Sequence, residues 1–238
     1  MDVSSGGLSG FEFFFLFMSV ILFFIFIAMI IGKLEQKRLE EIQNYCLKNG
    51  LNYSPKANNV TDCVKCLYVL RDKGHTNEWI NEMSGSRDGY NFSIFEHYSV
   101  AGYGNTKSSH TEIDTICVLS KENLNLPHFY LREENIIFDS IGKVFGGQDV
   151  NFSEDSDFSS KFVLQCLNEQ QIRKFFDKRI RQAFVCKHTK GYVYEGRFDC
   201  FVIALPGKEL NLSDRLILLT NAINIFRDLI PSDNEIPS

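Results

Sequence analysis

The sequence predicts an α+β protein in which a single N-terminal transmembrane helix is followed by a cytoplasmic domain with a mainly antiparallel sheet and packed helices. Three observations predict this class: an unbroken apolar run near the N-terminus, strand patterns grouped in the middle of the chain, and amphipathic helix patterns grouped towards its end. Strands and helices that are segregated along a chain are typical of α+β domains. With 44% hydrophobic and 23% charged residues, the chain has ordinary globular composition, which excludes a disordered or fibrous protein.

The apolar run extends from Phe13 to Ile31 and contains 19 residues without a charge, of which 15 are Phe, Leu, Ile or Val. At about 1.5 Å per residue it measures roughly 28 Å, close to the roughly 30 Å of a bilayer core. A buried core helix is seldom apolar on every side, and a signal peptide has a shorter run preceded by positive charge. We therefore predict a transmembrane helix over residues 11–32, with the lipid bilayer as the partner of Phe11–Gly32.

The positions of the basic residues predict the orientation of this helix. No Lys or Arg precedes the run, whereas Lys33, Lys37 and Arg38 follow it directly. The positive-inside rule then makes residues 1–10 a flexible extracytoplasmic tail and places the remaining chain in the cytoplasm of a single-pass protein. The seven cysteines are odd in number and irregularly spaced, which agrees with a reducing compartment.

Residues 33–50 are rich in helix-forming residues and predict a juxtamembrane helical stalk that ends at Gly50. Leu39, Ile42 and Cys46 share one face of this stalk, and Arg38 belongs to its solvated face. The polar segment 51–60 around Pro55 predicts a loop. The cytoplasmic α+β domain is expected to comprise residues 51–238.

Strand signals begin with a hairpin. Asp88-Gly89 separates the apolar-bearing segments 79–83 and 90–98, and this dipeptide is a strong turn signal between strands. Further strands are predicted over 112–119, 128–132 and 162–167, with a short helix over 136–145. A second hairpin is predicted from 192–195 and 198–205, with its turn at Gly196.

The C-terminal part contains two amphipathic helix patterns, over 168–185 and 213–230. Asn168 is placed to cap the first helix. The second is expected to bury a stripe formed by Leu216, Leu219, Ile223 and Phe226. The first helix carries five basic residues on its polar side: Arg173, Lys174, Lys178, Arg179 and Arg181. Such a face would bind anionic lipid or an acidic partner, unless it is simply the solvated side of a packed helix.

Four residues are candidates for acid–base catalysis: His97, His110, Glu112 and Asp114. If the two strands that carry them pair, these side chains could converge on one face. Polar residues on the solvent face of an antiparallel sheet produce the same pattern, and this second interpretation is preferred.

Cys63 and Cys66 have the spacing of a zinc or redox pair, but no second Cys or His pair completes a zinc site, so neither a metal nor a cofactor is predicted. The glycine-bearing segment 101–108 lacks two glycines of a phosphate-binding loop. A net charge of −5 and a pI near 5.6 give no support to nucleic acid as a partner.

The segment from Asn81 to Asp177 resembles an uncharacterised bacterial family of single-pass, N-terminally anchored membrane proteins. The matching residues are Gly89, Ile94–Tyr98, Leu126–Glu133, Gly147–Phe152, Asp157–Ser159 and Ile172–Phe176. Glu133 departs from the pattern, which tends to have a proline there. Because that family has no established activity, the resemblance implies a shared fold and a location in the bacterial inner membrane, and it assigns no catalytic residue.

These observations favour a membrane-anchored cytoplasmic binding or scaffold domain without catalytic activity, whose protein partner and ligand the sequence does not identify. Two alternatives stay open. One is a membrane-tethered enzyme built on the His and carboxylate candidates, and the other is a domain that senses anionic lipid.

Overall fold

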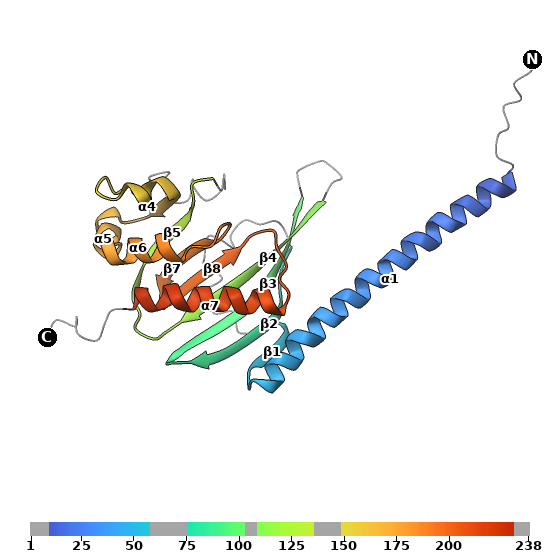
Figure 1. The fold of residues 1–238 in the computed structure, drawn as a ribbon, viewed down its shortest axis with the longest axis horizontal. Coiled ribbons are helices and arrows are strands. Elements are labelled where there is room, and N and C mark those ends of the chain that lie inside the picture. The colour runs from blue at the N-terminus through green and yellow to red at the C-terminus, as the bar shows by residue number, and fades with distance from the viewer. Residues whose placement is uncertain (1–9, 58–75, 103–108, 136–148, 231–238) are drawn as a thin grey trace, which may run out of the picture.

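The computed structural model describes residues 10–57, 76–102, 109–135 and 149–230 of the chain. Its elements follow one another in this order: α1 (Gly10–Lys48), β1 (Asn52–Lys56), β2 (Thr76–Arg87), β3 (Tyr90–Gly102), β4 (Ser109–Ser120), β5 (Leu126–Glu133), α4 (Ser156–Lys161), β6 (Phe162–Cys166), α5 (Glu169–Phe175), α6 (Lys178–Lys187), β7 (Val193–Phe198), β8 (Cys200–Leu205) and α7 (Leu212–Leu229). The predicted α+β class is therefore confirmed (Figure 1).

The strands form one eight-stranded sheet in the order β1-β2-β3-β4-β8-β7-β5-β6, and every neighbouring pair is antiparallel. The first hairpin lies where Asp88-Gly89 predicts it, because β2 and β3 pair on either side of this dipeptide. Asp88 and Gly89 have φ angles of 51° and 77°. Positive φ at both central residues is what a tight two-residue hairpin requires.

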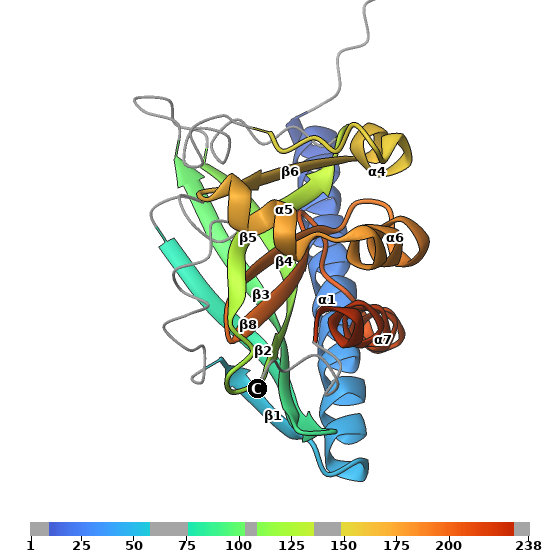
Figure 2. The same ribbon diagram turned by 90° about the vertical axis from the view of Figure 1, so that its left-hand side faces the viewer.

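The helices cover one face of the sheet. Figure 2 shows α1, α6 and α7 on the same side of the strands. Between these helices and the sheet lies the larger hydrophobic core, in which Phe129, Phe176, Phe184, Phe201 and Phe226 are fully buried. A second, smaller buried cluster on the opposite face contains Phe95, Ile116, Val118, Tyr130, Val193, Val202 and Ala204. Both faces of the sheet are thus apolar.

Helix α1 is one continuous helix of 39 residues. Its N-terminal part leaves the domain and exposes large apolar side chains, including Phe13, Phe17 and Phe24, which are 58–64% exposed. Its last turns pack on the core, where Ile42 and Cys46 are at most 1% exposed. Within the described residues α1 is the one helix that is long and apolar enough to cross a membrane.

Two predictions about the strand regions were wrong. The segment around Pro55 is not a loop but the edge strand β1, in which Pro55 has no partner in the β2 register. Proline lacks an N–H group and is therefore tolerated at a sheet edge. The second hairpin turns at Phe198 and Asp199 instead of Gly196. Gly196 instead lies within β7, where a Cβ would be 2.2 Å from the Phe129 ring, so close packing requires a glycine at this position.

The helix predicted over 168–185 consists of two helices, α5 and α6. The chain leaves helical geometry at Phe176, and the Asp177 carboxylate then accepts a hydrogen bond from the Ile180 N–H at 2.8 Å. Asp177 is therefore the N-cap of a new helix, just as Asn168 caps α5 through the Gln171 N–H. The helix predicted over 136–145 lies outside the described residues.

Candidate functional site

Four elements meet at a buried charged cluster, which we call the Glu96 cluster and define by Arg38 on α1, Asn81 on β2, Glu96 on β3 and Arg215 on α7. Glu96 and Arg215 are completely buried. Glu96 Oε1 accepts a hydrogen bond from Arg38 Nη1 at 2.6 Å and a second one from Arg215 Nη2. Its other oxygen accepts from Asn81 Nδ2 at 2.7 Å. One carboxylate thus holds two guanidinium groups and an amide.

Local backbone geometry brings Asn81 to this carboxylate. The β2–β3 register shifts between Ile80 and Met83, and Asn81 has a φ of 56°. This is a bulge, which turns a side chain out of the regular alternation, and asparagine is one of the few residues that adopt the left-handed region. The carbonyl oxygen of Asn81 also accepts a hydrogen bond from Arg215 Nη1 at 2.8 Å.

Further carboxylates surround Arg38, whose side chain is only 13% exposed. Arg38 Nη2 lies 2.7 Å from Glu35 Oε1 and 2.5 Å from Glu209 Oε1. Burial opposes the charge of Arg38, but its hydrogen bonds to Glu35 and Glu96 prevail and raise its pKa. Burial lowers the pKa of Arg215, although the Glu96 carboxylate opposes this shift. An arginine titrates so far above neutral pH that both guanidinium groups remain charged.

The Glu96 cluster joins α1 to the domain. Buried charges are favourable only where they are paired and hydrogen-bonded, and each strong donor or acceptor here has such a partner. Removing one partner would leave an uncompensated buried charge, so the cluster holds α1, the sheet and α7 in one arrangement. The prediction that Arg38 lies on a solvated stalk face was therefore wrong.

The alternation of apolar residues along β3 and α7 contains a signal for this cluster. Tyr90, Phe92 and Ile94 alternate as buried residues of β3, and Glu96 is the next position of the same face. The buried stripe predicted on α7 was only partly correct. Ile223 and Phe226 are buried, but Leu216 and Leu219 are only half-buried. The buried positions of α7 are Arg215, Leu218, Ala222, Ile223, Ile225, Phe226 and Leu229. On each of these two elements a charged residue occupies a position of the buried apolar pattern. Two such residues of opposite charge predict a buried ion pair.

Two of the four acid–base candidates come together, on the opposite face of the sheet. His97 and Asp114 are direct neighbours in the β3–β4 register, with 3.4 Å between Nδ1 and Oδ2. Both are at most 2% exposed. Asp114 Oδ1 also accepts a hydrogen bond from the Gly207 N–H at 2.9 Å, and the Trp79 ring lies 5.1 Å from the imidazole.

The other two candidates lie further along the same strand. Glu112 pairs with Ser99 and His110 with Ala101 in the β3–β4 register. The side chain of His110 lies outside the described residues, as do Cys63 and Cys66. The structure therefore joins His97 to Asp114 in a buried pair. Among the described residues no group of three His, Cys, Asp or Glu side chains could hold a metal ion.

The five predicted basic residues of α5 and α6 have different environments. Arg181 is buried, with Nε 2.8 Å from Asp155 Oδ2 and its guanidinium carbon 4.3 Å from the centre of the Phe152 ring. Arg173 pairs with Glu169 at 2.7 Å, and Arg179 donates to the Asp228 carbonyl at 2.5 Å.

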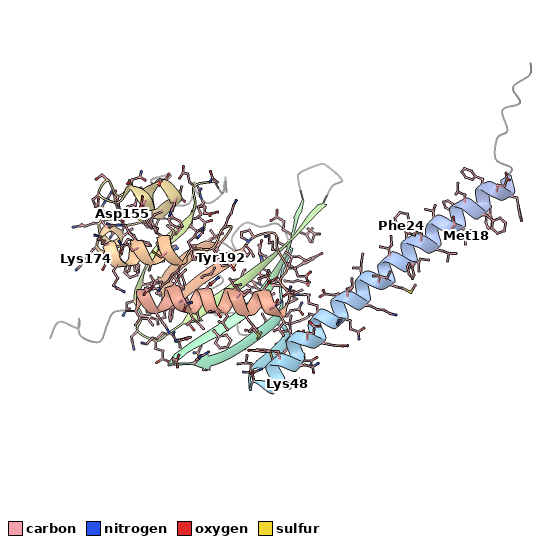
Figure 3. The ribbon with its side chains drawn as sticks, in the orientation of Figure 1. Met18, Phe24, Lys48, Asp155, Lys174 and Tyr192 are labelled. Carbon is pink, nitrogen blue, oxygen red and sulfur yellow. The ribbon has the colours of Figure 1, made fainter. Side chains whose placement is uncertain are left out.

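Lys174 and Lys178 are exposed, and neither forms a salt bridge within the described part of the chain. A pocket of about 470 Å³ adjoins this surface and is lined by Lys174 and Arg179 together with apolar residues, including Phe175 and Leu229. Figure 3 shows Lys174 at the end of the domain remote from Met18 and Phe24 on the apolar half of α1. Contact of these basic residues with lipid or an acidic partner stays a prediction.

The comparisons with known proteins support the fold alone. No family model and no curated protein matches the sequence. Among solved structures, the chain is similar to the crystal structure of the mycobacterial trehalose monomycolate transport factor A, TtfA, with a TM-score of 0.52 and 11% sequence identity. The match covers 84% of this chain and 98% of the mycobacterial chain. At this identity the likeness shows a shared α+β fold and nothing more.

Proposed function

We propose that this chain is a single-pass inner-membrane protein that holds a non-catalytic binding domain at a fixed position on the cytoplasmic side of the bilayer. One observation carries this proposal. The helix that is apolar enough to cross a membrane continues without a break into the domain and is fixed there by the Glu96 cluster. A flexible tether would only keep a domain nearby, whereas this connection also fixes its orientation.

The surface of α5 and α6 is the best candidate for the partner. Lys174 and Lys178 are exposed there, the neighbouring pocket has apolar walls, and both lie at the end of the domain remote from the apolar half of α1. A surface in that position is open to a cytoplasmic protein. Charge complementarity then favours a partner with acidic and apolar side chains.

The similar mycobacterial protein is named a transport factor, and its name suggests the class of partner. We therefore extend the proposal to a partner that is itself a component of membrane transport. The shared architecture supports this extension, and 11% identity carries no ligand from one protein to the other.

The orientation is tested with thiol labelling. Cys186 is exposed, while Cys46, Cys117, Cys166 and Cys200 are buried. In a Cys63→Ser/Cys66→Ser variant, a membrane-impermeant maleimide should label Cys186 only after cells are permeabilised. Labelling of Cys186 in intact cells would show that the domain lies outside and would overturn the proposal.

Partner binding is tested by charge reversal in the full-length protein. A photo-crosslinking amino acid at Gln171, an exposed residue that lines the same pocket, should yield a defined cross-linked protein in cells. The Lys174→Glu/Lys178→Glu variant should lose this product. The matched control, Lys48→Glu/Lys56→Glu, reverses two exposed lysines elsewhere on the domain and should retain it. An equal yield from both variants would remove this surface from the proposal.

A further inference from the structure

A second pocket, of about 580 Å³, lies at the start of α7, where the β8–α7 loop and the α6–β7 loop meet. Lys190 and Lys208 line it, as do the apolar side chains of Leu205, Leu210 and Ile217. Its volume falls within the roughly 300–1,000 Å³ that is usual for small-molecule sites. Cations and apolar side chains in one pocket suit a ligand that has an anionic end and a hydrocarbon end.

The two carboxylates that line this pocket already have polar partners, whereas its two lysines have no salt bridge with any described residue. The Glu209 carboxylate lies 2.5 Å from Arg38 Nη2. The carboxylate of Asp214 accepts a hydrogen bond from Asn211 Nδ2 at 2.9 Å, in the first turn of α7, where the helix dipole favours negative charge. Lys190 and Lys208 are exposed and form no salt bridge with any described residue, although Lys190 also acts electrostatically on the Glu133 carboxylate. Both ammonium groups can therefore contact a ligand.

The pocket lies on the side of the domain next to the membrane helix. Figure 1 shows the start of α7 beside α1, and Arg38 on α1 donates to the Leu210 carbonyl at 3.0 Å. Arg38 follows Ile31, the last residue of the apolar run, by seven positions, which is about 10 Å along a helix. The headgroup layer of one leaflet is roughly 5–8 Å thick. The pocket rim at Leu210 thus lies close to the headgroups.

We propose that this pocket binds the phosphate headgroup of an anionic phospholipid from the leaflet that adjoins the domain. Lys190 and Lys208 hold the phosphate, and the glycerol and first methylenes contact Leu205, Leu210 and Ile217. The side chain of Ile217 is 54% exposed on α7 beside the pocket, which is where a hydrocarbon chain would enter. This inference rests on the proposed function only for the position of the domain against the bilayer.

Native mass spectrometry of the full-length protein in detergent tests the ligand class. Phosphatidylglycerol should bind in preference to phosphatidylcholine. The Lys190→Gln/Lys208→Gln variant should bind phosphatidylglycerol at least about tenfold more weakly, because it removes both cations that would hold the phosphate. The matched control Lys174→Gln/Lys178→Gln removes the same charge from α5 and α6 and should bind as the unmodified protein does.

Three outcomes would overturn the proposal: equal binding of the two lipids, unchanged phosphatidylglycerol binding by Lys190→Gln/Lys208→Gln, or displacement of the lipid by millimolar glycerol 3-phosphate. The last result would identify a site for a soluble phosphate ester. Failure here is separable from failure of the proposed function, because thiol labelling of Cys186 and cross-linking at Gln171 do not depend on these two lysines.

The apolar part of the site has its own test. Ile217→Ser removes an exposed side chain and should therefore leave folding intact while weakening the binding of long-chain phosphatidylglycerol more than that of a dihexanoyl analogue. Leu167→Ser is the control, since Leu167 is 64% exposed and does not line the pocket. If Ile217→Ser binds each of the two lipids as tightly as Leu167→Ser does, the proposed contact between Ile217 and the hydrocarbon chain is refuted.

Discussion

Arg38 on α1 and Glu96 in the third strand form a buried ion pair, with 2.6 Å between Nη1 and Oε1, although 58 positions separate them in the sequence. Arg215, on the last helix, binds the same carboxylate oxygen. The pairing makes α1 an integral part of the folded domain. The stability of the domain and the attachment of α1 to it therefore depend on the same few side chains.

The Glu96→Gln variant should show this dependence directly. It removes the charge that compensates the fully buried Arg215, so we expect the free energy of unfolding to fall by about 3–5 kcal/mol. Thermal melting of the full-length protein in detergent, followed by circular dichroism, measures the change. Glu78→Gln, at an exposed position of the neighbouring strand, should shift the melting temperature little. Similar melting temperatures for the two variants would contradict the role given to Glu96.

The packing of α1 on the core can be probed at Ile42. Ile42 is fully buried, so Ile42→Ala should cost about 2–5 kcal/mol and should increase hydrogen exchange in the last turns of α1. Leu47→Ala, a few positions further along α1, changes a side chain that is 73% exposed and should cost little. If hydrogen exchange in the last turns of α1 is the same in Ile42→Ala as in the unmodified protein, the packing of α1 does not depend on this contact.

Asp155 predicts a specific pH dependence. The hydrogen bond from Arg181 lowers the pKa of Asp155 below its ordinary value of 3.8. This effect outweighs the opposing effect of burial, and a hydrogen bond from the Phe158 N–H lowers the pKa further. A lowered carboxyl pKa contributes stability that is present above the unfolded pKa and is lost as the pH falls through the folded value.

The Asp155→Asn variant keeps an α4 cap but lacks the charge that pairs with Arg181, so near neutral pH it should be less stable than the unmodified protein by about 1–3 kcal/mol. This difference should shrink as the pH falls below about 4, where the carboxylate becomes protonated. Urea unfolding at several pH values measures it. Asp157→Asn, at an exposed position of α4, should show no such convergence. A difference that stays constant down to pH 2 would refute the assignment.

Gly196 is required by packing and not by a turn. A Cβ at this position would meet the Phe129 ring at 2.2 Å, so Gly196→Ala should destabilise the domain by at least about 1–3 kcal/mol. Gly32→Ala introduces the same methyl group where nothing lies within 4 Å and should be tolerated. Melting temperatures in detergent compare the two. If the Gly196→Ala/Phe129→Leu variant recovers melting temperature relative to Gly196→Ala, the Phe129 ring is the cause of the lost stability.

Local signals predicted much of the fold. Hydrophobic run length predicted α1, alternation and Asp88-Gly89 predicted β2 and β3, and Asn168 marked the start of α5. These signals act over a few residues, so each can be read without the remaining chain. The errors at Pro55 and Gly196 had a different origin, because their causes are a position at the sheet edge and a ring more than 60 residues away.

The candidate site was less accessible to sequence analysis for the same physical reason. Glu96 directly precedes His97 in the sequence, but its partners Arg38 and Arg215 come from opposite ends of the chain, and only the folded sheet brings them together. The proximity of His97 and Asp114 was predictable because paired strands of a hairpin align them. Their burial was not, since it depends on what covers that face of the sheet.

The unbroken course of α1 also has a mechanical consequence. A transmembrane helix adapts to a thinner or thicker bilayer by changing its tilt. No hinge interrupts α1 between its apolar segment and Ile42. A change in the tilt of this helix would therefore rotate the whole sheet through the same angle. In the membrane position proposed above, lipid composition would thereby set the direction in which α5 and α6 point relative to the bilayer.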